Sequence, residues 1–194
     1  MKTIALLTAG GLAMMSAGAA DQINNVKFLF QFASPVEAPA WQIVNDDVMG
    51  GISRSTFTVA SNGPALFRGE LSLANNGGFA SVRSQPEVKN LSRWDGFLIR
   101  VRGDGRTYKF TARTDGSFDS VLYQLSFTTK AGAWTEHRFA FTELVPTFRG
   151  RVLTEVPKFD PARTTSVGFM LADKQAGAFA LEIDWIKADS TARN

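Results

Sequence analysis

The sequence of 194 residues contains no cysteine, and His137 is its only histidine. Without cysteine the chain can form no disulfide, thiolate nucleophile or cysteine-ligated metal site. No G-x-S-x-G or H-E-x-x-H pattern occurs, and His137 lies in an alternating, strand-like run between Glu136 and Arg138. We therefore interpret His137 as a passive side chain and expect no enzyme activity, no catalytic residue and no cofactor.

Loop carboxylates leave one enzymatic alternative open. Two carboxylates at a suitable separation can hydrolyse a glycosidic bond, and Asp46, Asp104 and Glu182 are candidates for such a pair. Acidic loop residues occur in every β-rich protein of this size, so they support a hydrolase only weakly. We keep this reading as a remote alternative.

Charge of one sign is not in large excess either. The chain has 21 Lys and Arg against 18 Asp and Glu, which gives a formal net charge of +3. An excess this small does not by itself indicate binding to nucleic acid. We expect no nucleic-acid partner.

Long apolar runs are absent apart from one near the N-terminus. Residues 4–15 are apolar, follow a positively charged start and precede the small residues 16–20, an order typical of a secretory signal peptide. The run is shorter than the roughly 20 residues that span a bilayer, although an uncleaved anchor or a buried helix remains an alternative. We predict a signal peptide over residues 1–20, cleaved after Ala19 or Ala20. The mature protein is then periplasmic or secreted, with no stable membrane span.

The mature chain, residues 21–194, has the length of a single domain and is rich in core-forming side chains, including 16 Phe and 4 Trp. Its dominant pattern alternates apolar and polar residues with period two, which predicts strands that bury one face. Strands are predicted at residues 26–32, 41–45, 56–60, 65–73, 79–84, 97–101, 108–112, 121–128, 136–141, 166–171 and 179–186, with short helical turns at 142–144 and 160–163. About ten strands without a long amphipathic helix indicate an all-β sandwich or barrel.

The most distinctive segment is Asn45–Ser53, in which Asn45 and the adjacent carboxylates of Asp46 and Asp47 precede a glycine pair. Such oxygen donors could bind ligand hydroxyls or hold a hard cation. The structural alternative, which we favour, is a tight turn whose backbone amides are satisfied by these side chains. A full calcium loop needs more oxygen ligands than this segment supplies, so we expect no metal site.

Two further loops contain candidate binding residues. Asn75 and Asn76 begin a segment that runs to Arg83, where polar side chains at the rim of a sandwich could hydrogen-bond a sugar or a protein; the alternative is a hairpin loop. Asp104 and Arg106 lie in the segment Arg102–Tyr108, which lacks the following helix that a phosphate loop requires and is better explained as a tight hairpin.

A basic patch is predicted on one sheet face if the strands on either side of this turn pair. Alternation then places Arg100 and Arg102 of one strand beside Lys109 and Arg113 of the next. Glu182 and the nearby Asp184 could neutralise part of this patch, and charges on a solvated face are the simplest explanation. The alternative is a surface for an acidic partner.

Several of these segments, in order, resemble the complex I intermediate-associated protein 30 family over about residues 28–188. The matching segments are Trp41, Asn45–Ser53, Phe67–Gly69, Asn76–Arg83, Arg102–Tyr108, Phe148–Arg151, Gly168–Met170 and Gly177–Ile186. The segment Phe148–Arg151 adds Arg149 and Arg151 to the candidate binding residues. The resemblance implies a jelly-roll β-sandwich of the galactose-binding-domain-like type.

The resemblance also implies a function. Mitochondrial members act as non-enzymatic assembly factors that hold membrane-arm intermediates of respiratory complex I. We therefore expect a module that binds a protein partner, such as an intermediate of a membrane-protein complex, in an assembly or chaperone-like role in the bacterial envelope. The alternative is a carbohydrate-binding module that uses Trp94 or Trp134 as an aromatic platform.

Overall fold

A computed structural model of the chain describes residues 25–117 and 119–190. The segment predicted to be a signal peptide, residues 1–20 with its cleavage site after Ala19 or Ala20, lies outside the described residues. Within the described part, no helix is both long and apolar enough to cross a bilayer.

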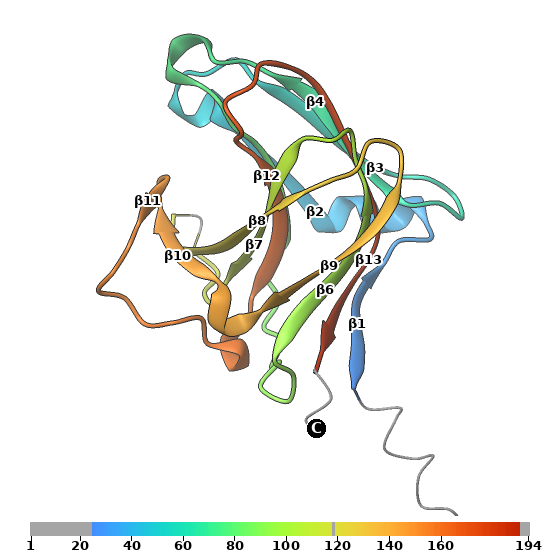
Figure 1. Cartoon of the computed structure of the whole chain (residues 1–194), viewed down its shortest axis with the longest axis vertical. Coiled ribbons are helices and arrows are strands. Elements are labelled where there is room, and N and C mark those ends of the chain that lie inside the picture. The colour runs from blue at the N-terminus through green and yellow to red at the C-terminus, as the bar shows by residue number, and fades with distance from the viewer. Residues whose placement is uncertain (1–24, 118, 191–194) are drawn as a thin grey trace, which may run out of the picture.

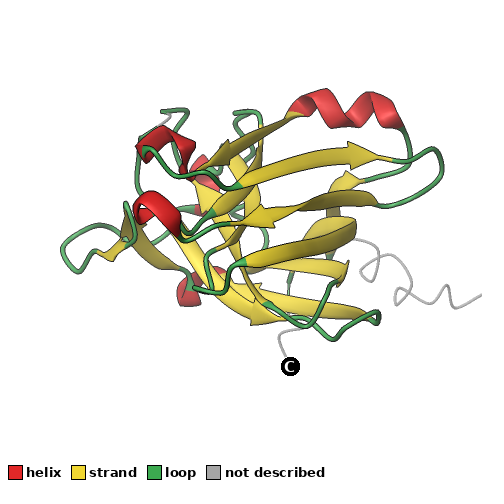
Figure 2. Cartoon of the chain, turned by 90° about the horizontal axis from the view of Figure 1, so that it is seen from above, coloured by secondary structure: helices red, strands yellow, loops and turns green. Residues whose placement is uncertain are grey.

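Two antiparallel sheets form a β-sandwich of the jelly-roll type, and Figure 2 shows the strands stacked in two layers. The six-stranded sheet has the order β3-β4-β13-β6-β9, with β1 also paired to β13. Its strands are β1 (Val26–Gln31), β3 (Arg54–Val59), β4 (Ala65–Leu71), β6 (Gly96–Arg102), β9 (Trp134–Ala140) and β13 (Gly177–Asp189). The seven-stranded sheet has the order β11-β10-β8-β7-β12-β5-β2. Its strands are β2 (Trp41–Asn45), β5 (Ala80–Ser84), β7 (Thr107–Arg113), β8 (Leu122–Thr128), β10 (Val145–Phe148), β11 (Arg151–Val152) and β12 (Ser166–Leu171).

Short 3-10 segments lie between the strands. They are η2 (Pro35–Ala40), η3 (Asp46–Met49), η4 (Ala74–Asn76), η5 (Phe141–Glu143) and η6 (Pro161–Arg163). The last two coincide with the helical turns predicted from the sequence, whereas the first three were not predicted.

The core between the sheets is aromatic, as the alternating pattern predicts. Phe110 of β7 lies with its ring centroid 5.0 Å from that of Phe97 and 5.0 Å from that of Phe139, both in the opposite sheet. Phe169 of β12 joins the cluster at 5.7 Å from Phe110. All four side chains are buried, and full burial of a Phe contributes about 1.5–3 kcal/mol of apolar transfer free energy.

Five loops carry the chain from one sheet to the other at the same end of the sandwich, around the top of Figure 1. We call this end the crossover end. Its loops are residues 46–53, 72–79, 103–106, 129–133 and 172–176. These connections define the jelly-roll topology.

This topology corrects two predictions. The segment Gly103–Arg106 is not a hairpin, because β6 pairs with β9 and β13 whereas β7 pairs with β8 and β12. Likewise, the Asn75–Gly78 loop joins β4 of one sheet to β5 of the other rather than closing a hairpin. Alternation reveals which face of a strand is buried but not which sheet the strand joins.

Candidate functional site

The carboxylate of Asp46 is a buried node that joins two loops of the crossover end. Its Oδ1 accepts the backbone N–H of Ser53 at 2.9 Å, and its Oδ2 accepts the Ser53 hydroxyl at 2.6 Å. The same Oδ2 accepts the backbone N–H groups of Gly78 at 2.7 Å and Phe79 at 3.3 Å. Asp46 itself is fully buried. Loops 46–53 and 72–79 are therefore clamped to one another through a single side chain.

Two glycines leave the space that this carboxylate occupies. A Cβ at Gly51 would lie 2.3 Å from the Asp46 Cγ, and one at Gly77 would lie 2.6 Å from its Oδ2. Burial raises the pKa of Asp46, but the hydrogen bonds from Ser53, Gly78 and Phe79 stabilise the charged form and leave the pKa lowered overall. The node is a buried anion whose donors all come from the protein, which supports the structural interpretation of this segment.

Large apolar side chains are exposed around the node. Val48, Met49 and Ile52 of the first loop are 57%, 59% and 53% exposed, and Leu73 of the second loop is 45% exposed. The two loops meet where the Ser72 N–H donates to the Ser53 hydroxyl oxygen at 3.0 Å, so Ile52 and Leu73 flank a direct contact. We call these four residues the apolar tip. An apolar group presented on loops that are locked together is typical of a surface that binds a partner.

The other predicted residues of these loops are distributed between core and surface. Asn45 is buried, and its Oδ1 accepts the Ser55 hydroxyl at 2.7 Å. Asp47 is exposed, and its side chain accepts the backbone N–H of Val48 at 3.1 Å. Asn75 and Asn76 are exposed with φ of 56° and 58°, a left-handed conformation that Asn tolerates better than most residues.

A second clamp holds the loops 103–106 and 172–176. The Arg106 guanidinium forms a two-pronged ion pair with Asp173, with Nε–Oδ2 and Nη2–Oδ1 distances of 2.9 and 2.7 Å. Side-chain exposure is only 12% and 5% for the two partners. Asp104 Oδ2 accepts the Tyr108 hydroxyl and the Ala180 N–H, both at 2.9 Å. Asp104 and Arg106 are thus structural residues of the crossover end.

The predicted basic patch of Arg100, Arg102, Lys109 and Arg113 does not exist as such, because β6 and β7 belong to different sheets. Arg100 and Arg102 lie on the outward face of the six-stranded sheet. There Arg100 pairs with Asp184 at 2.6 Å, and Arg102 pairs with Glu182. Asp184 and Glu182, which were expected to neutralise part of the patch, therefore each form an ion pair with one of these arginines.

Lys109 and Arg113 lie on the outward face of the seven-stranded sheet instead, because Tyr108, Phe110 and Ala112 point into the core. The register of β5, β12 and β7 brings Arg83 to the same face. Sequence reasoning named Arg83 only as a rim residue of the Asn75–Arg83 segment. The strand β12 that places Arg83 beside β7 follows it by more than 80 positions, so no local pattern reveals the neighbourhood.

Arg149 and Arg151 lie on the hairpin formed by β10 and β11. Arg149 stacks over Phe148 at 5.2 Å and pairs with Asp119 of the loop between β7 and β8. Arg151 is exposed. Both arginines lie at the surface, and Arg149 already pairs with Asp119.

Neither tryptophan offers an open aromatic platform. The guanidinium carbons of Arg100 and Arg102 lie 5.1 and 5.0 Å from the ring centroid of Trp134. Lys27 lies 5.3 Å from the ring centroid of Trp94. Stacked cations occupy the ring faces that a sugar would need.

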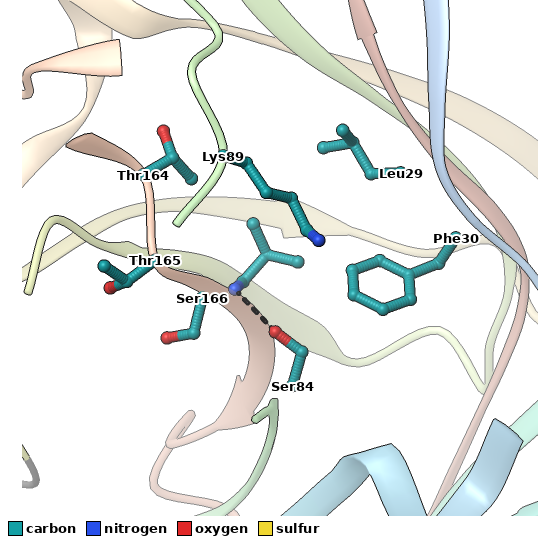
Figure 3. Close-up of a pocket in the computed structure, with 8 residues that line it drawn as sticks. Leu29, Phe30, Ser84, Lys89, Thr164, Thr165 and Ser166 are labelled. Atoms are coloured by element: carbon teal, nitrogen blue, oxygen red, sulfur yellow. Dashed lines mark hydrogen bonds between the residues drawn. The ribbon is translucent and has the colours of Figure 1, made fainter. Parts of the chain in front are cut away.

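One small pocket lies at the opposite end, between β1 and the start of β12 (Figure 3). Ser84 and Lys89 contribute its main polar groups. The Ser84 hydroxyl oxygen accepts the Val167 N–H at 3.2 Å, and Lys89 extends over the ring of Phe30 at 5.7 Å. These groups are engaged with the protein itself, so the pocket presents little chemistry to a ligand.

His137 packs its ring 4.9 Å from that of Phe127 and bonds the Thr135 hydroxyl at 2.9 Å. Burial lowers its pKa. Over residues 25–117 and 119–190, no three His, Asp or Glu side chains come close enough to hold a metal ion. The geometry agrees with a passive role for this histidine.

Comparison with known proteins first identifies relatives by sequence. The chain is 28% identical over 180 residues to "Complex I intermediate-associated protein 30, mitochondrial" of Drosophila melanogaster, a match that covers 81% of this chain and 61% of that protein. The protein of the same name from Mus musculus is 28% identical over 184 residues, with 84% and 56% covered. The chain thus matches little more than half the length of these relatives. Their names place them in mitochondria, which overturns the expectation of a periplasmic or secreted protein.

Solved structures share the fold. A family 11 carbohydrate-binding module from Clostridium thermocellum, in complex with a β-1,3-1,4-mixed-linked tetrasaccharide, matches with a TM-score of 0.68 and 14% identity, covering 88% of this chain and 98% of that one. An agarase, AgWH50C, matches with a TM-score of 0.59 and 11% identity over 88% of this chain and 25% of that one. At such identities the likeness extends to the fold alone.

A family model extends the sequence match along most of the chain. The model described as complex I intermediate-associated protein 30 matches residues 30–183. This range includes both clamps of the crossover end and the cations of the seven-stranded sheet.

Proposed function

The chain belongs to the complex I intermediate-associated protein 30 family, and on that premise we propose that it is a non-enzymatic module that binds a protein during assembly of a respiratory complex. The relatives are named for association with an intermediate of complex I. An intermediate of that complex is the partner we propose for this chain, with the mitochondrion as the compartment.

The observation that carries this proposal is the apolar tip. Val48, Met49, Ile52 and Leu73 expose roughly half of their surface, on loops that a buried carboxylate locks together. Ordered apolar side chains lose little conformational entropy when a partner covers them, so their burial favours association. The locked loops therefore present a preformed contact surface rather than a flexible one.

The contacts of the three candidate carboxylates support the non-enzymatic part of the proposal. The three carboxylates that could form a hydrolytic pair are each committed to protein partners. Asp46 accepts hydrogen bonds from the two loops that it joins, and Asp104 accepts the hydroxyl of Tyr108 in β7. Glu182 pairs with Arg102. A carboxylate held in this way is not available to protonate a leaving group or to attack a sugar.

Affinity capture tests the proposal. The wild-type chain, Met49→Asp/Ile52→Asp and the control Val88→Asp would each be used to capture partners from detergent-solubilised mitochondrial membranes. Val88 is 75% exposed and lies between β5 and β6, away from the crossover end, so it controls for the loss of one exposed apolar side chain. We expect wild type and the control to retain complex I subunits and the double variant to lose at least 90% of them.

Two results would contradict the proposal. If wild type captured no complex I subunit, the proposed partner would be wrong. If the double variant captured as much as wild type, the apolar tip would not be the contact surface. Circular dichroism of each variant shows whether the fold is intact, because the substituted side chains are exposed and substitution there should leave stability within about 0.5 kcal/mol.

Carbohydrate binding is the second candidate, favoured by the fold shared with carbohydrate-binding modules. Fold alone does not determine function. Titration calorimetry with the mixed-linked tetrasaccharide tests it directly. We expect no heat of binding, because arginines already stack over Trp134.

A further inference from the structure

Strand β9 forms one edge of the six-stranded sheet, because β6 is its only strand partner among the described residues. The register of this pair runs without a shift from Gly96 opposite Ala140 to Arg102 opposite Trp134. β9 contains neither a proline nor a bulge, two devices that commonly protect an exposed edge. It therefore presents a regular edge that is 7 residues long.

Hydrogen bonds at the end of β9 show which of its residues bond β6. The N–H of Phe141 donates to the Asp95 carbonyl oxygen at 2.8 Å, and the preceding N–H, that of Ala140, donates to the Glu143 carboxylate at 3.2 Å instead. Successive residues of a strand direct their backbone groups alternately to its two sides. The odd-numbered residues of β9 therefore bond β6, and the even-numbered residues direct their N–H and C=O groups away from the sheet.

Three of these outward positions are free. The backbone groups of Trp134, Glu136 and Arg138 point away from β6 and form no hydrogen bond within the described part of the chain. Such a row of donors and acceptors, repeated at every second residue, is what a further strand pairs with.

The other edges are shorter, irregular or covered. On the opposite side of the sandwich, β2 and β3 lie against each other: the Ser55 hydroxyl donates to Asn45 Oδ1 at 2.7 Å, and the rings of Trp41 and Phe57 stack with centroids 5.0 Å apart. The register of β1 shifts after Phe28, and β11 has only 2 residues. Among the described strands, β9 thus offers the longest regular edge without a facing strand.

The seven-stranded sheet extends farther than the six-stranded sheet on the side of β9. Phe139 of β9 packs on Phe110 of β7 and Phe127 of β8, with ring centroids 5.0 and 5.7 Å apart, so β9 lies over β7 and β8. Beyond β8 the larger sheet continues with β10 and β11. No described strand of the six-stranded sheet lies opposite these two, which leaves room for one more strand beside β9.

The burial of β8 is incomplete on the same side. Tyr123 and Phe127 of β8 point inward and are buried, whereas Leu125 between them is only partly buried. The segment 153–160 reaches Tyr123, whose hydroxyl donates to the Pro157 carbonyl oxygen at 3.0 Å. A strand added beside β9 would extend the smaller sheet toward Leu125 and cover more of it.

We propose that an extended segment of the partner protein adds to β9 as a further strand of the six-stranded sheet. Its main chain pairs with the outward backbone groups of Trp134, Glu136 and Arg138, and its inward side chains pack toward Leu125. The proposal rests on the proposed function, since it describes how one part of the partner is held.

The charges along β9 indicate the chemistry of that segment. Arg138 pairs with Asp95 and Asp189, whereas Glu136 is exposed and forms no salt bridge among the described residues. Opposite charges on directly paired residues of a sheet attract. The segment that fits best alternates apolar and polar residues and places a lysine or arginine opposite Glu136.

A fluorescein-labelled peptide of sequence Thr-Val-Thr-Val-Lys-Val-Thr-Val-Thr is a suitable probe, and fluorescence anisotropy measures its dissociation constant. Directly paired residues share a face of the sheet, so with the lysine opposite Glu136 the threonines and the lysine bond β9 and the valines face inward. N-methylation of the lysine and its two nearest threonines removes three donors and should weaken binding by about tenfold or more. N-methylation of the two central valines, whose N–H groups face away from β9, should change it by less than about threefold.

Two variants of the protein separate the backbone from the side chain. Glu136→Pro removes the outward N–H, which takes no part in the pairing with β6, and proline is tolerated at such edge positions. Glu136→Gln is the matched control, because it removes the charge and keeps the N–H. We expect the control to weaken binding less than about fivefold and the proline variant to bind about tenfold more weakly than the control. Circular dichroism shows whether both variants are folded.

Equal dissociation constants for the two N-methylated peptides would overturn the proposal, because binding would not depend on the backbone of β9. The same follows if both variants capture complex I subunits equally, since the partner would then not use this edge. Sedimentation velocity tests a different occupant. A dimeric wild type and a monomeric Glu136→Pro would mean that β9 pairs with a second copy of the chain, and the assignment to a partner protein would be wrong.

Failure of the proposed function gives a different result. If the peptides and variants behave as expected but wild type captures no complex I subunit, the proposed function fails while the strand-addition site stands. If capture succeeds and the peptide does not bind, only the strand addition at β9 is wrong.

Discussion

The crossover end and the outward face of the seven-stranded sheet use charged side chains in opposite ways. At the crossover end, each of the carboxylates Asp46, Asp104 and Asp173 accepts several hydrogen bonds from the loops that join the two sheets or from the strands next to them. On the outward face of the seven-stranded sheet, Arg83, Lys109 and Arg113 lie on strands that contain no acid. A buried charge whose hydrogen bonds are all made stabilises its surroundings, whereas cations that lie on one sheet face repel each other.

The segments that are most distinctive in the sequence have structural roles in this molecule. The segments Asn45–Ser53 and Arg102–Tyr108 stand out in the sequence because they contain adjacent acids, glycines and turn residues, and both build the crossover end. Arg83 and Arg113 are ordinary polar positions of alternating strands. The first class should therefore respond to substitution with lost stability.

The largest expected effect is on the Asp46 clamp. Asp46→Asn replaces a buried acceptor by a group whose NH₂ faces the donors of Ser53 and Gly78. We expect a loss of about 3 kcal/mol in the free energy of unfolding, since each unsatisfied buried polar group costs about 1–3 kcal/mol. Urea denaturation measures it. The adjacent, exposed Asp47→Asn is the matched control, with an expected change below about 0.5 kcal/mol. A similar loss of unfolding free energy in both variants would show that the hydrogen bonds of Asp46 contribute no more to stability than an exposed carboxylate does.

The next effect is on the pairing of β5 with β12 in the seven-stranded sheet. Gly168→Ala introduces a Cβ that would lie 2.4 Å from the Val82 carbonyl oxygen. The pairing of β5 with β12 must shift to accept it, and we expect a loss of about 2 kcal/mol. In Gly116→Ala the added Cβ would meet only the Pro86 Cβ, at 3.7 Å, and stability should hardly change. Thermal unfolding of the two variants makes this comparison. An unchanged melting temperature for Gly168→Ala would show that the strands separate easily at this point.

A smaller effect concerns pH. The hydrogen bond from Arg106 lowers the pKa of Asp173 below its ordinary value of 3.8, and the clamp around Asp46 lowers the pKa of that residue as well. A depressed folded-state pKa contributes stability that is present above about pH 4 and is lost as the pH falls through the folded value. We expect unfolding free energies measured between pH 5 and pH 2 to fall, and to fall less steeply in Asp173→Asn. If the unfolding free energies of the variant and wild type depended on pH equally steeply, Asp173 would not contribute to the pH dependence of stability.

The smallest effect on stability is expected at Lys109. This residue lies on the outward face of β7 and is in no salt bridge among the described residues, so Lys109→Gln should change the unfolding free energy by less than about 0.5 kcal/mol. A marked gain in stability would show that its charge strains the folded state through repulsion from Arg83 and Arg113. Chemical denaturation at low and high salt distinguishes these cases, because salt screens such repulsion.

Much of the fold follows from the sequence because alternation is a local property. The strands that contain Phe97, Phe110 and Phe169 were each predicted, and each of these side chains is buried. The strands β10 and β11 were not predicted, since they are short and Pro146 interrupts the pattern. Strand pairing could not be predicted either, and the Gly103–Arg106 turn looked like a hairpin for that reason.

The candidate site was less predictable because its contacts are distant in the sequence. Asp46 was identified as a turn residue, but its bonds to Gly78 and Phe79 span more than 30 positions. Arg83 and Arg113 become neighbours only because β12 inserts between β5 and β7. Exposure of Val48 and Met49 depends on how the loop is oriented, which an apolar pair in a sequence does not reveal.

Strand β13 has a consequence for the order in which the chain can assemble as it is synthesised. It pairs with β1, β4 and β6 at the middle of its sheet, and it is C-terminal to every other described strand. Until it leaves the ribosome, the hairpin of β3 and β4 and the pair of β6 and β9 have no strand to join them, and the apolar side chains of Phe67 and Ile99 stay uncovered. Folding of this sandwich is thus completed after translation of its final strand, and a ribosome stalled before residue 177 carries a chain suited to chaperone binding.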